Sequence, residues 1–167
     1  MFEPTPIRTG RRIDVAAARA AFDVAVDTHS QELGHFFLAR FFGFEVGYVD
    51  ETCTVAFDVR EDLCNPRGLL QGGVIATALD VAMAHLAQHL ARRGAATANL
   101  AVQYLRGVQT GRVQATARVA RKGASLWFLE ANLLAADGER IASASATLAL
   151  APAAQAALSE TQCNDTQ

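Results

Sequence analysis

The fold is decided by residues 71–94, which read QGGVIATALDVAMAHLAQHLARRG. This run predicts one long helix that starts at Gly72 and Gly73 and ends near Arg92, Arg93 and Gly94. Basic side chains in a last turn face the negative end of the helix dipole, and a following glycine accepts a left-handed backbone. The apolar side chains between these ends point in nearly every direction, so the helix must be covered on most sides.

The rest of the chain predicts the strands that cover this helix. Apolar and polar residues alternate in Thr52–Val59, which indicates a strand. Four further strands are expected as one antiparallel meander: Ala96–Leu105, Arg112–Arg121, Leu126–Ala136 and Arg140–Leu150. Between the last two, Asp137-Gly138 predicts a tight hairpin turn with positive φ at both residues. Only Ala, Ser and Thr occur in 142–147, which allows the helix to approach the sheet closely.

The 167 residues fit one domain. We expect a short tail at 1–12, one α+β domain at 13–152 and a flexible tail at 153–167. The domain begins with two short helices, in Ile13–Asp27 and Gln31–Phe42, and continues with one long helix inside a curved antiparallel sheet.

Composition argues against several classes of protein. A formal net charge of -2 gives no basic field for a nucleic-acid backbone. Three widely spaced cysteines predict neither a disulfide framework nor a zinc site, which fits a reducing cytoplasm. Residues 1–12 lack the apolar core of a secretory signal. Polar side chains within the long apolar helix, Asp80 and His85 among them, argue against a membrane span.

The start of the long helix and its one acidic residue carry the predicted chemistry. Glycines entering a helix leave its first N–H groups bare, and Gly72 N–H is then suited to hold an oxyanion. The alternative is that the glycines serve only a tight turn. Asp80 is a carboxylate in an apolar helix, and it is either used in catalysis or hydrogen-bonded for structure. Because the two residues lie about 12 Å apart along one helix axis, they act on one bond only if they come from two chains.

The run Asn65…Gly68…Gln71-Gly72-Gly73…Asp80, followed by Thr97 and Tyr104, resembles the phenylacetic-acid-degradation (PaaI-like) thioesterases of the hot-dog superfamily. The resemblance covers about residues 44–150. It implies a hot-dog fold, hydrolysis of acyl-CoA or aryl-CoA thioesters, and a homodimer or a dimer of dimers. Coenzyme A is then part of the substrate, and no separate cofactor is implied.

The resemblance also implies a role for each matching position. Asn65 orders the loop, Gly72 supplies the oxyanion N–H, Asp80 is base or nucleophile and Thr97 positions the water. Asn65 and Gly72 belong to one subunit, and Asp80 and Thr97 to its neighbour. Further candidates for substrate contacts are Gly73, Thr77, Arg106, Arg121 and Lys122. The three basic residues among them are expected to bind the phosphates of CoA, or else are ordinary charged turn residues.

Gln71 departs from the family pattern, which has histidine at that position. A glutamine amide can hydrogen-bond a thioester carbonyl but cannot carry a proton. A thiolate leaves readily, because a thiol has a pKa near 8.5, so one carboxylate can suffice. Two alternatives stay open: an acyl-CoA-binding protein without turnover, and an acyl-thioester hydratase or dehydratase, which commonly pairs a carboxylate with a histidine.

Two other groups of residues have both a functional and a structural interpretation. His85 and His89 have the i, i+4 spacing of two metal ligands, but no third ligand accompanies them, and we assign no metal. The aromatic cluster in 36–44 is expected to be core, with some members lining an acyl or aryl pocket.

Overall fold

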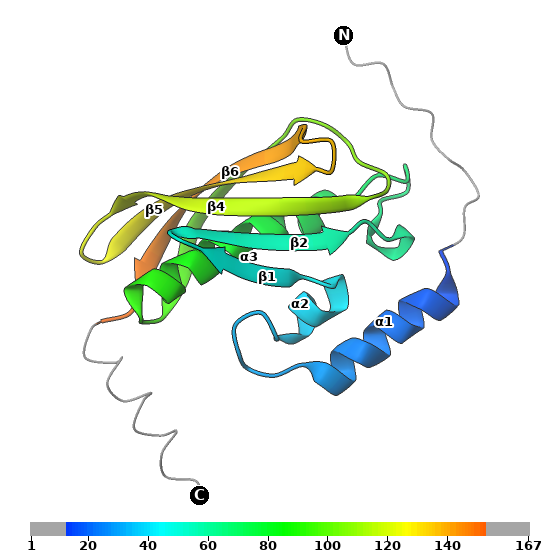
Figure 1. Cartoon of the computed structure of the whole chain (residues 1–167), viewed down its shortest axis with the longest axis horizontal. Helices are drawn as coiled ribbons and strands as arrows, with labels where there is room; N and C mark the ends of the chain where they lie inside the picture. Colours follow the sequence, from blue (N-terminus) through cyan, green and yellow to red (C-terminus); the bar gives the residue numbers. More distant parts are fainter. Residues whose placement is uncertain (1–12, 153–167) are drawn as a thin grey trace, which may run out of the picture.

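The computed structural model describes residues 13–152, and the tails expected at 1–12 and 153–167 lie outside the described residues. Figure 1 shows the path of the chain. The helices are α1 (Val15–Thr28), α2 (Phe37–Phe42), the 3-10 turn η1 (Glu61–Leu63) and α3 (Gly72–Ala91). The strands are β1 (Glu45–Val49), β2 (Thr52–Asp58), β3 (Ala95–Tyr104), β4 (Arg112–Lys122), β5 (Leu126–Ala135) and β6 (Arg140–Leu150).

The six strands form one antiparallel sheet in the order β1-β2-β4-β5-β6-β3. The predicted meander is therefore wrong at one strand. β4, β5 and β6 follow one another, but β3 pairs with β6 and lies at the edge of the sheet. Alternation of apolar residues identifies a strand, but it does not say which strand lies beside it.

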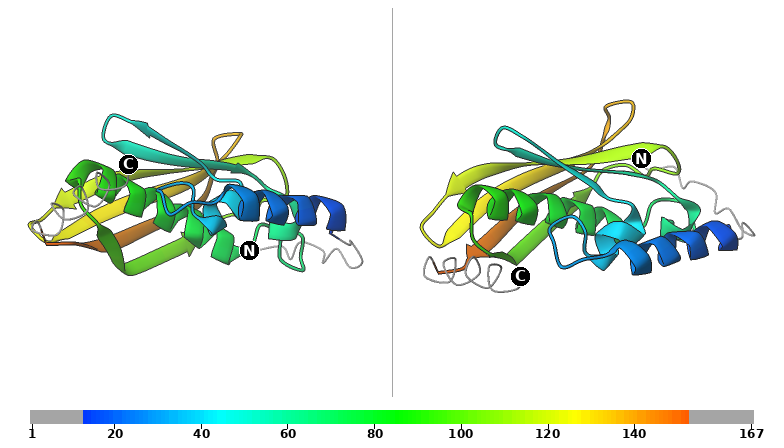
Figure 2. Two further views of the ribbon diagram at one scale, coloured as in Figure 1. Left: turned by 90° about the horizontal axis from the view of Figure 1, so that it is seen from below. Right: turned by 60° about the horizontal axis from the view of Figure 1, so that its bottom comes forward.

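The long helix α3 lies against one face of the curved sheet (Figure 2), as predicted. Its buried side chains, such as Leu79, Met83 and Leu86, meet buried side chains of the central strands, such as Val113 and Leu129. Small residues in β6 were expected to let the helix approach the sheet closely, and three of them are buried: Ala142, Ala144 and Ala146. By length and composition α3 could cross a membrane, but more than half of its apolar window is buried inside this domain.

One side of α3 is not covered within the chain, although buried residues occur along the rest of the helix, as expected. We call it the open strip, and it consists of Gly73, Ala76, Thr77, Asp80 and Ala84, all of them partly or fully exposed. The edge strand β3 is also exposed along most of its length. A helix strip of small residues and an exposed strand edge are both features that a second chain can cover.

Several boundaries differ from the sequence predictions for local reasons. The second predicted helix, Gln31–Phe42, is helical only from Phe37, because Gly34 has a φ of 80° and Ser30 N–H donates to the His35 carbonyl. The strand β1 is absent from the sequence prediction, because the glycine within it, Gly47, is also typical of a turn. Gly47 pairs with Thr54, whose Oγ1 would lie 3.0 Å from a Cβ at residue 47.

Two turns also differ from the prediction. Only Gly138 has a positive φ in the β5–β6 turn, while Asp137 instead accepts a hydrogen bond from Glu139 N–H at 2.9 Å. At the end of α3, the left-handed residue is Arg92, with a φ of 53°, rather than the glycine two positions later. The helix thus ends one or two residues earlier than its basic residues suggested.

Candidate active site

The loop before α3 is ordered by the Asn65 side chain. Its Oδ1 accepts hydrogen bonds from Arg67 N–H at 2.9 Å and from Leu69 N–H at 3.3 Å. Gln71 follows at the N-cap of α3 with an exposed side chain that makes no capping hydrogen bond. The two hydrogen bonds to Asn65 hold this loop in place. The amide side chain of Gln71 is left available at the start of the helix.

The first two amides of α3 are bare. Within residues 13–152, neither Gly72 N–H nor Gly73 N–H donates a hydrogen bond. The first amide of the helix that does so is Val74 N–H, which donates to the Gln71 carbonyl. Tyr104 of β3 packs against Gly72 and donates its hydroxyl to the Gly72 carbonyl at 3.0 Å. Tyr104 was noted in the sequence only as part of the family pattern, and this contact fixes the helix start against the edge strand.

Steric need does not explain the glycine pair. Neither Gly72 nor Gly73 has a positive φ. A Cβ at Gly72 would meet the Tyr104 ring at 3.4 Å, an ordinary contact, and a Cβ at Gly73 would meet nothing within 4 Å. The tight-turn interpretation of these glycines is therefore not supported by the backbone, and the space beside Gly73 is open for another molecule.

Asp80 lies on the open strip of α3 and contacts the edge strand. Its Oδ1 accepts a hydrogen bond from the Thr97 hydroxyl at 2.7 Å, and within the described residues it forms no salt bridge. Thr97 therefore orients the carboxylate directly. Thr77, one turn before Asp80, donates its own hydroxyl back to the Gly73 carbonyl at 2.9 Å.

Asp80 lines a hollow of about 250 Å³ that we call the Asp80 hollow. Its walls come from α3 and from the segment before α2, and they consist of Gln31, Glu32, Leu33, Phe36, Asp80, Val81, Ala84, His85 and Gln88. Of the aromatic cluster, Phe36 lines this hollow, whereas Phe44 is buried in the core. The core interpretation therefore holds for Phe44, while an acyl or aryl pocket at Phe36 stays a prediction.

His85 is the one buried polar side chain among the described residues, and its only role considered from the sequence is that of a metal ligand. Burial lowers its pKa to about 4, so the ring is neutral at pH 7. Its Nδ1 lies 3.3 Å from the Tyr48 hydroxyl of β1, whose pKa burial raises to about 12. No group of three metal-ligating side chains exists within 13–152.

Gly72 lines a different hollow from Asp80. This second space, the Gly72 hollow, measures about 290 Å³ and is lined by Asn65, Leu69, Leu70, Gly72, Ile75, Tyr104, Leu105, Arg106 and Gly107. The two residues begin and continue the same helix, about 12 Å apart along its axis. One chain therefore does not bring the bare amide and the carboxylate together.

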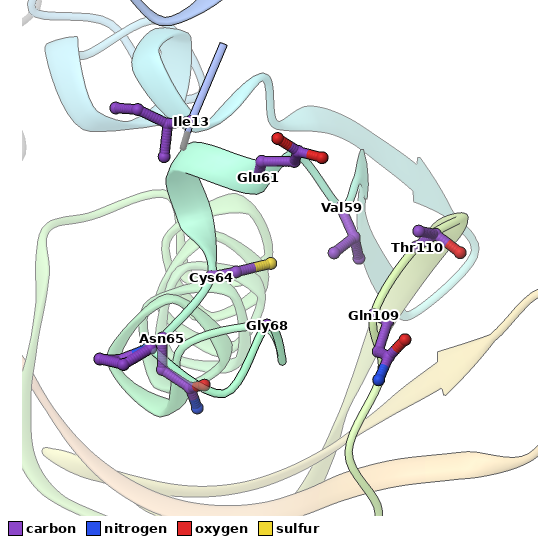
Figure 3. Close-up of a pocket in the computed structure, with 9 residues that line it drawn as sticks. Ile13, Val59, Glu61, Cys64, Asn65, Gly68, Gln109 and Thr110 are labelled. Atoms are coloured by element: carbon purple, nitrogen blue, oxygen red, sulfur yellow. The ribbon is translucent and has the colours of Figure 1, made fainter. Parts of the chain in front are cut away.

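A further cavity of about 300 Å³ lies on the other side of the loop before α3. Figure 3 shows its lining, which includes Ile13, Val59, Cys64 and Thr110. Neither Gly72 nor Asp80 reaches it, and Asn65 is the residue it shares with the Gly72 hollow. The cavity is therefore separate from the candidate catalytic groups.

The three basic candidates are not together in one chain. Arg106 lines the Gly72 hollow, where its guanidinium pairs with Asp137 and Glu139. Arg121 and Lys122 lie at the far end of β4, and Lys122 pairs with Glu51 at 2.5 Å. The 11 residues of β4 span about 35 Å at the usual rise, so its two ends cannot serve one ligand within a chain.

This helix, sheet and strand order define a hot-dog fold. Residues 67–142 match the family model described as the Thioesterase superfamily. The matched segment contains the glycine pair, Asp80 and Thr97. A search of curated proteins finds no match to this sequence.

Solved structures with the same fold include several named as thioesterases. The conserved protein PA5202 from Pseudomonas aeruginosa is 25% identical, over 68% of this chain and 93% of that chain, with a TM-score of 0.64. A mutant of thioesterase PA1618 from Pseudomonas aeruginosa is 21% identical over 85% of this chain and 96% of that chain (TM-score 0.65). Thioesterase HI1161 from Haemophilus influenzae is 18% identical over 66% and 79% (TM-score 0.63).

Proposed function

We propose that this protein hydrolyses acyl-CoA or aryl-CoA thioesters as a PaaI-like thioesterase, in a site shared between two copies. Asp80 of one copy and the Gly72 N–H of the other act on the same thioester. The observation that carries the proposal is a pair of contacts between α3 and the exposed strand β3. Tyr104 bonds to Gly72 near one end of β3, and Thr97 bonds to Asp80 near the other.

These two contacts predict how the copies meet. An antiparallel pairing of β3 with β3 of a second copy, centred on residue 101, sets Tyr104 opposite the partner's Thr97, because β3 has a register shift between Thr97 and Asn99. Because each contact links β3 to α3, the same pairing brings Gly72 towards the partner subunit's Asp80. The open strip of each α3 is then covered at the same time. Such a dimer, or a dimer of dimers built from it, completes two equivalent sites.

The chemistry follows from the groups at each site. A water oxygen attacks the thioester carbon while Asp80 accepts a proton from that water. The carbonyl oxygen becomes an oxyanion next to the bare Gly72 N–H of the partner, with the Gln71 amide as a second donor. The C–S bond breaks, the thiolate of CoA leaves, and it takes the proton from Asp80. Direct attack by the carboxylate, followed by hydrolysis of the anhydride, uses the same groups.

The basic residues fit the same dimer. The β3 pairing reverses the direction of the second sheet, so the Arg121 and Lys122 end of one copy comes to the same end of the joint sheet as the partner's Arg106. CoA phosphates bound at that end would meet cations from both copies. Arg106 is already paired with two carboxylates, so we expect Arg121, which is exposed and forms no ion pair within residues 13–152, to contribute more.

A hydratase or dehydratase is a second candidate, because His85 lines the same hollow as Asp80. His85 is five positions after Asp80, which is about 7.5 Å along the helix axis. In addition, His85 Nδ1 is already within hydrogen-bond distance of the Tyr48 hydroxyl. At this separation, His85 and Asp80 are poorly placed to exchange protons with one carbon atom. The bare amides of α3 are better placed to hold an oxyanion. A change in enoyl absorbance with enoyl or hydroxyacyl thioesters would reveal that activity.

Thiol release from a panel of acyl-CoA and aryl-CoA esters tests the proposal. The Asp80→Asn variant keeps an oxygen that can accept the Thr97 hydrogen bond but removes the basic carboxylate. We expect turnover by the native protein and a loss of about 10²–10⁴-fold in the variant. Saturable binding without thiol release by the native protein would instead indicate an acyl-CoA-binding protein, and equal activity of the two would exclude Asp80 as the catalytic group.

A further inference from the structure

The Asp80 hollow contains a polar group that thioester hydrolysis does not require. His85 is 3% exposed, yet it lines the hollow. Its Nδ1 is engaged with Tyr48, while Nε2 forms no hydrogen bond within residues 13–152. Among these residues, Arg106 Nε is the fully buried side-chain polar atom that lacks a partner, so His85 Nε2 is not fully buried.

The Tyr48 hydroxyl determines which ring nitrogen carries the proton. Tyr48 is protonated at neutral pH, and His85 Nδ1 is the acceptor that it finds within the described residues. If the tyrosine O–H donates to Nδ1, the proton of the neutral imidazole is on Nε2. The stacking of His89 on the Tyr48 ring, with centroids 4.3 Å apart, holds the tyrosine in this position. In that tautomer His85, which lines the hollow, carries its N–H donor on Nε2.

The position of this donor matches the acyl part of the substrate. If the thioester carbonyl lies between Asp80 and the partner's Gly72, as proposed, the Asp80 hollow is the space beside it that can take the acyl group. His85 lies about 7.5 Å further along the helix axis. Val81, Ala84 and Phe36 supply apolar walls between the two residues. A short chain or a single ring fills this distance.

We propose that His85 is a specificity-determining residue that donates a hydrogen bond from Nε2 to an oxygen at the far end of the acyl group, with Tyr48 as its positioning residue. The preferred substrates are thioesters of short acyl groups that end in a hydroxyl or carbonyl oxygen. This inference rests on the proposed function, because it deepens the account of the same site. An unsubstituted chain leaves the buried donor without a partner, and that is unfavourable.

The test compares hexanoyl-CoA with 6-hydroxyhexanoyl-CoA in the full-length protein. The native protein should have the higher kcat/KM for the hydroxy ester, and His85→Leu should reduce the hydroxy-to-plain ratio about tenfold, the effect of one hydrogen bond. Tyr48→Phe should reduce the ratio less, since the ring stays but the tautomer is no longer fixed. A purely structural role for either residue would lower both activities together and leave the ratio unchanged.

His29→Leu is the matched control, because it removes an exposed histidine that contacts Phe37 and does not line the hollow. It should leave the ratio unchanged. An unaltered ratio in His85→Leu, with both esters hydrolysed, would overturn this inference and leave the proposed function standing.

Calorimetry with non-hydrolysable thioether analogues of the two esters separates the two proposals further. Tighter binding of the hydroxy analogue that His85→Leu abolishes, without turnover of any ester, would support the role of His85 and overturn hydrolysis. Equal binding of the two analogues by the native protein would overturn the role of His85.

Discussion

The Thr97 hydroxyl donates a hydrogen bond to Asp80 Oδ1 at 2.7 Å, and this contact joins the exposed edge strand to the middle of the core helix. A donor at this distance fixes the direction of the carboxylate. Since β3 is also the strand expected to meet a second copy, the orientation of Asp80 is coupled to the dimer interface.

Replacing Thr97 by Val should lower kcat without a comparable change in KM. The valine keeps the size of the side chain but removes the donor, so the carboxylate loses one hydrogen bond of about 1 kcal/mol or more. We expect a loss of about tenfold in kcat, measured by thiol release. Thr97→Ser, which retains the hydroxyl, is the control. A kcat of Thr97→Val equal to that of the native protein would mean that the contact does not orient Asp80 for catalysis.

Gly73→Ala should separate folding from catalysis. An alanine Cβ meets nothing within 4 Å in the chain, and alanine restricts the unfolded state, so thermal unfolding should show unchanged or slightly raised stability, by about 0.5 kcal/mol. Activity should fall, because the methyl group occupies space expected for the thioester or the second copy. Gly138→Ala is the contrasting variant, since its φ of 82° makes alanine strained, and it should lose stability. Full activity in Gly73→Ala would argue against a site at the open strip.

Ala101→Lys should weaken the dimer. Residue 101 lies near the expected two-fold axis of the β3 pairing, and the substitution places two cations close together across that axis. Sedimentation should then show that the variant dissociates at a higher protein concentration than the native protein does, and activity should be lost in parallel. Ala136→Lys, on the β5–β6 turn, adds the same charge away from β3 and should have no such effect. A monomeric variant that retained activity would exclude a shared site.

The buried His85 predicts a specific dependence of stability on pH. Its pKa is about 4 in the folded protein, below the ordinary 6.5, so the unfolded chain binds more protons between these values. Folding stability should therefore fall as the pH decreases from 6.5 to 4, by something on the order of 3 kcal/mol from this group. Urea unfolding of native protein and His85→Leu at pH 7 and pH 4.5 isolates the contribution, since the carboxylates are common to both. Equal pH dependence of the two proteins would contradict it.

The sequence predicted the elements of the fold better than their arrangement. The length of α3 and the strands from Ala95 onwards follow from local periodicity, which one segment carries by itself. The pairing of β3 with β6 depends on contacts between distant segments, and local patterns do not record these. β1 was missed because a glycine in an edge strand has the same local signal as a turn.

The candidate site shows the same division. Gly72 and Asp80 could be proposed from the sequence because a glycine pair and an acid are unusual in one apolar helix. The role proposed for His85 could not, because its hollow is lined in part by residues 31–36 and its partner Tyr48 lies in the strand that was missed. The one available signal was a lone histidine within an apolar helix. Arg106 was expected among phosphate-binding residues, but its two carboxylate partners come from the β5–β6 turn.

The central claim is that the oxyanion donor and the carboxylate of one site belong to different chains, and mixing two inactive variants tests it directly. Asp80→Asn removes the base. Gly72→Pro removes the N–H, and proline is well tolerated at the first residue of a helix, here after the extended residue Gln71. Each variant alone should be inactive.

Co-refolding equal amounts of the two variants makes about half of the dimers mixed, and each mixed dimer has one site with both groups intact. We therefore expect the mixture to recover roughly a quarter of native activity, measured as thiol release. No recovery in a mixture whose mixed dimers are verified by mass spectrometry would show that both groups act from the same chain and would contradict the account.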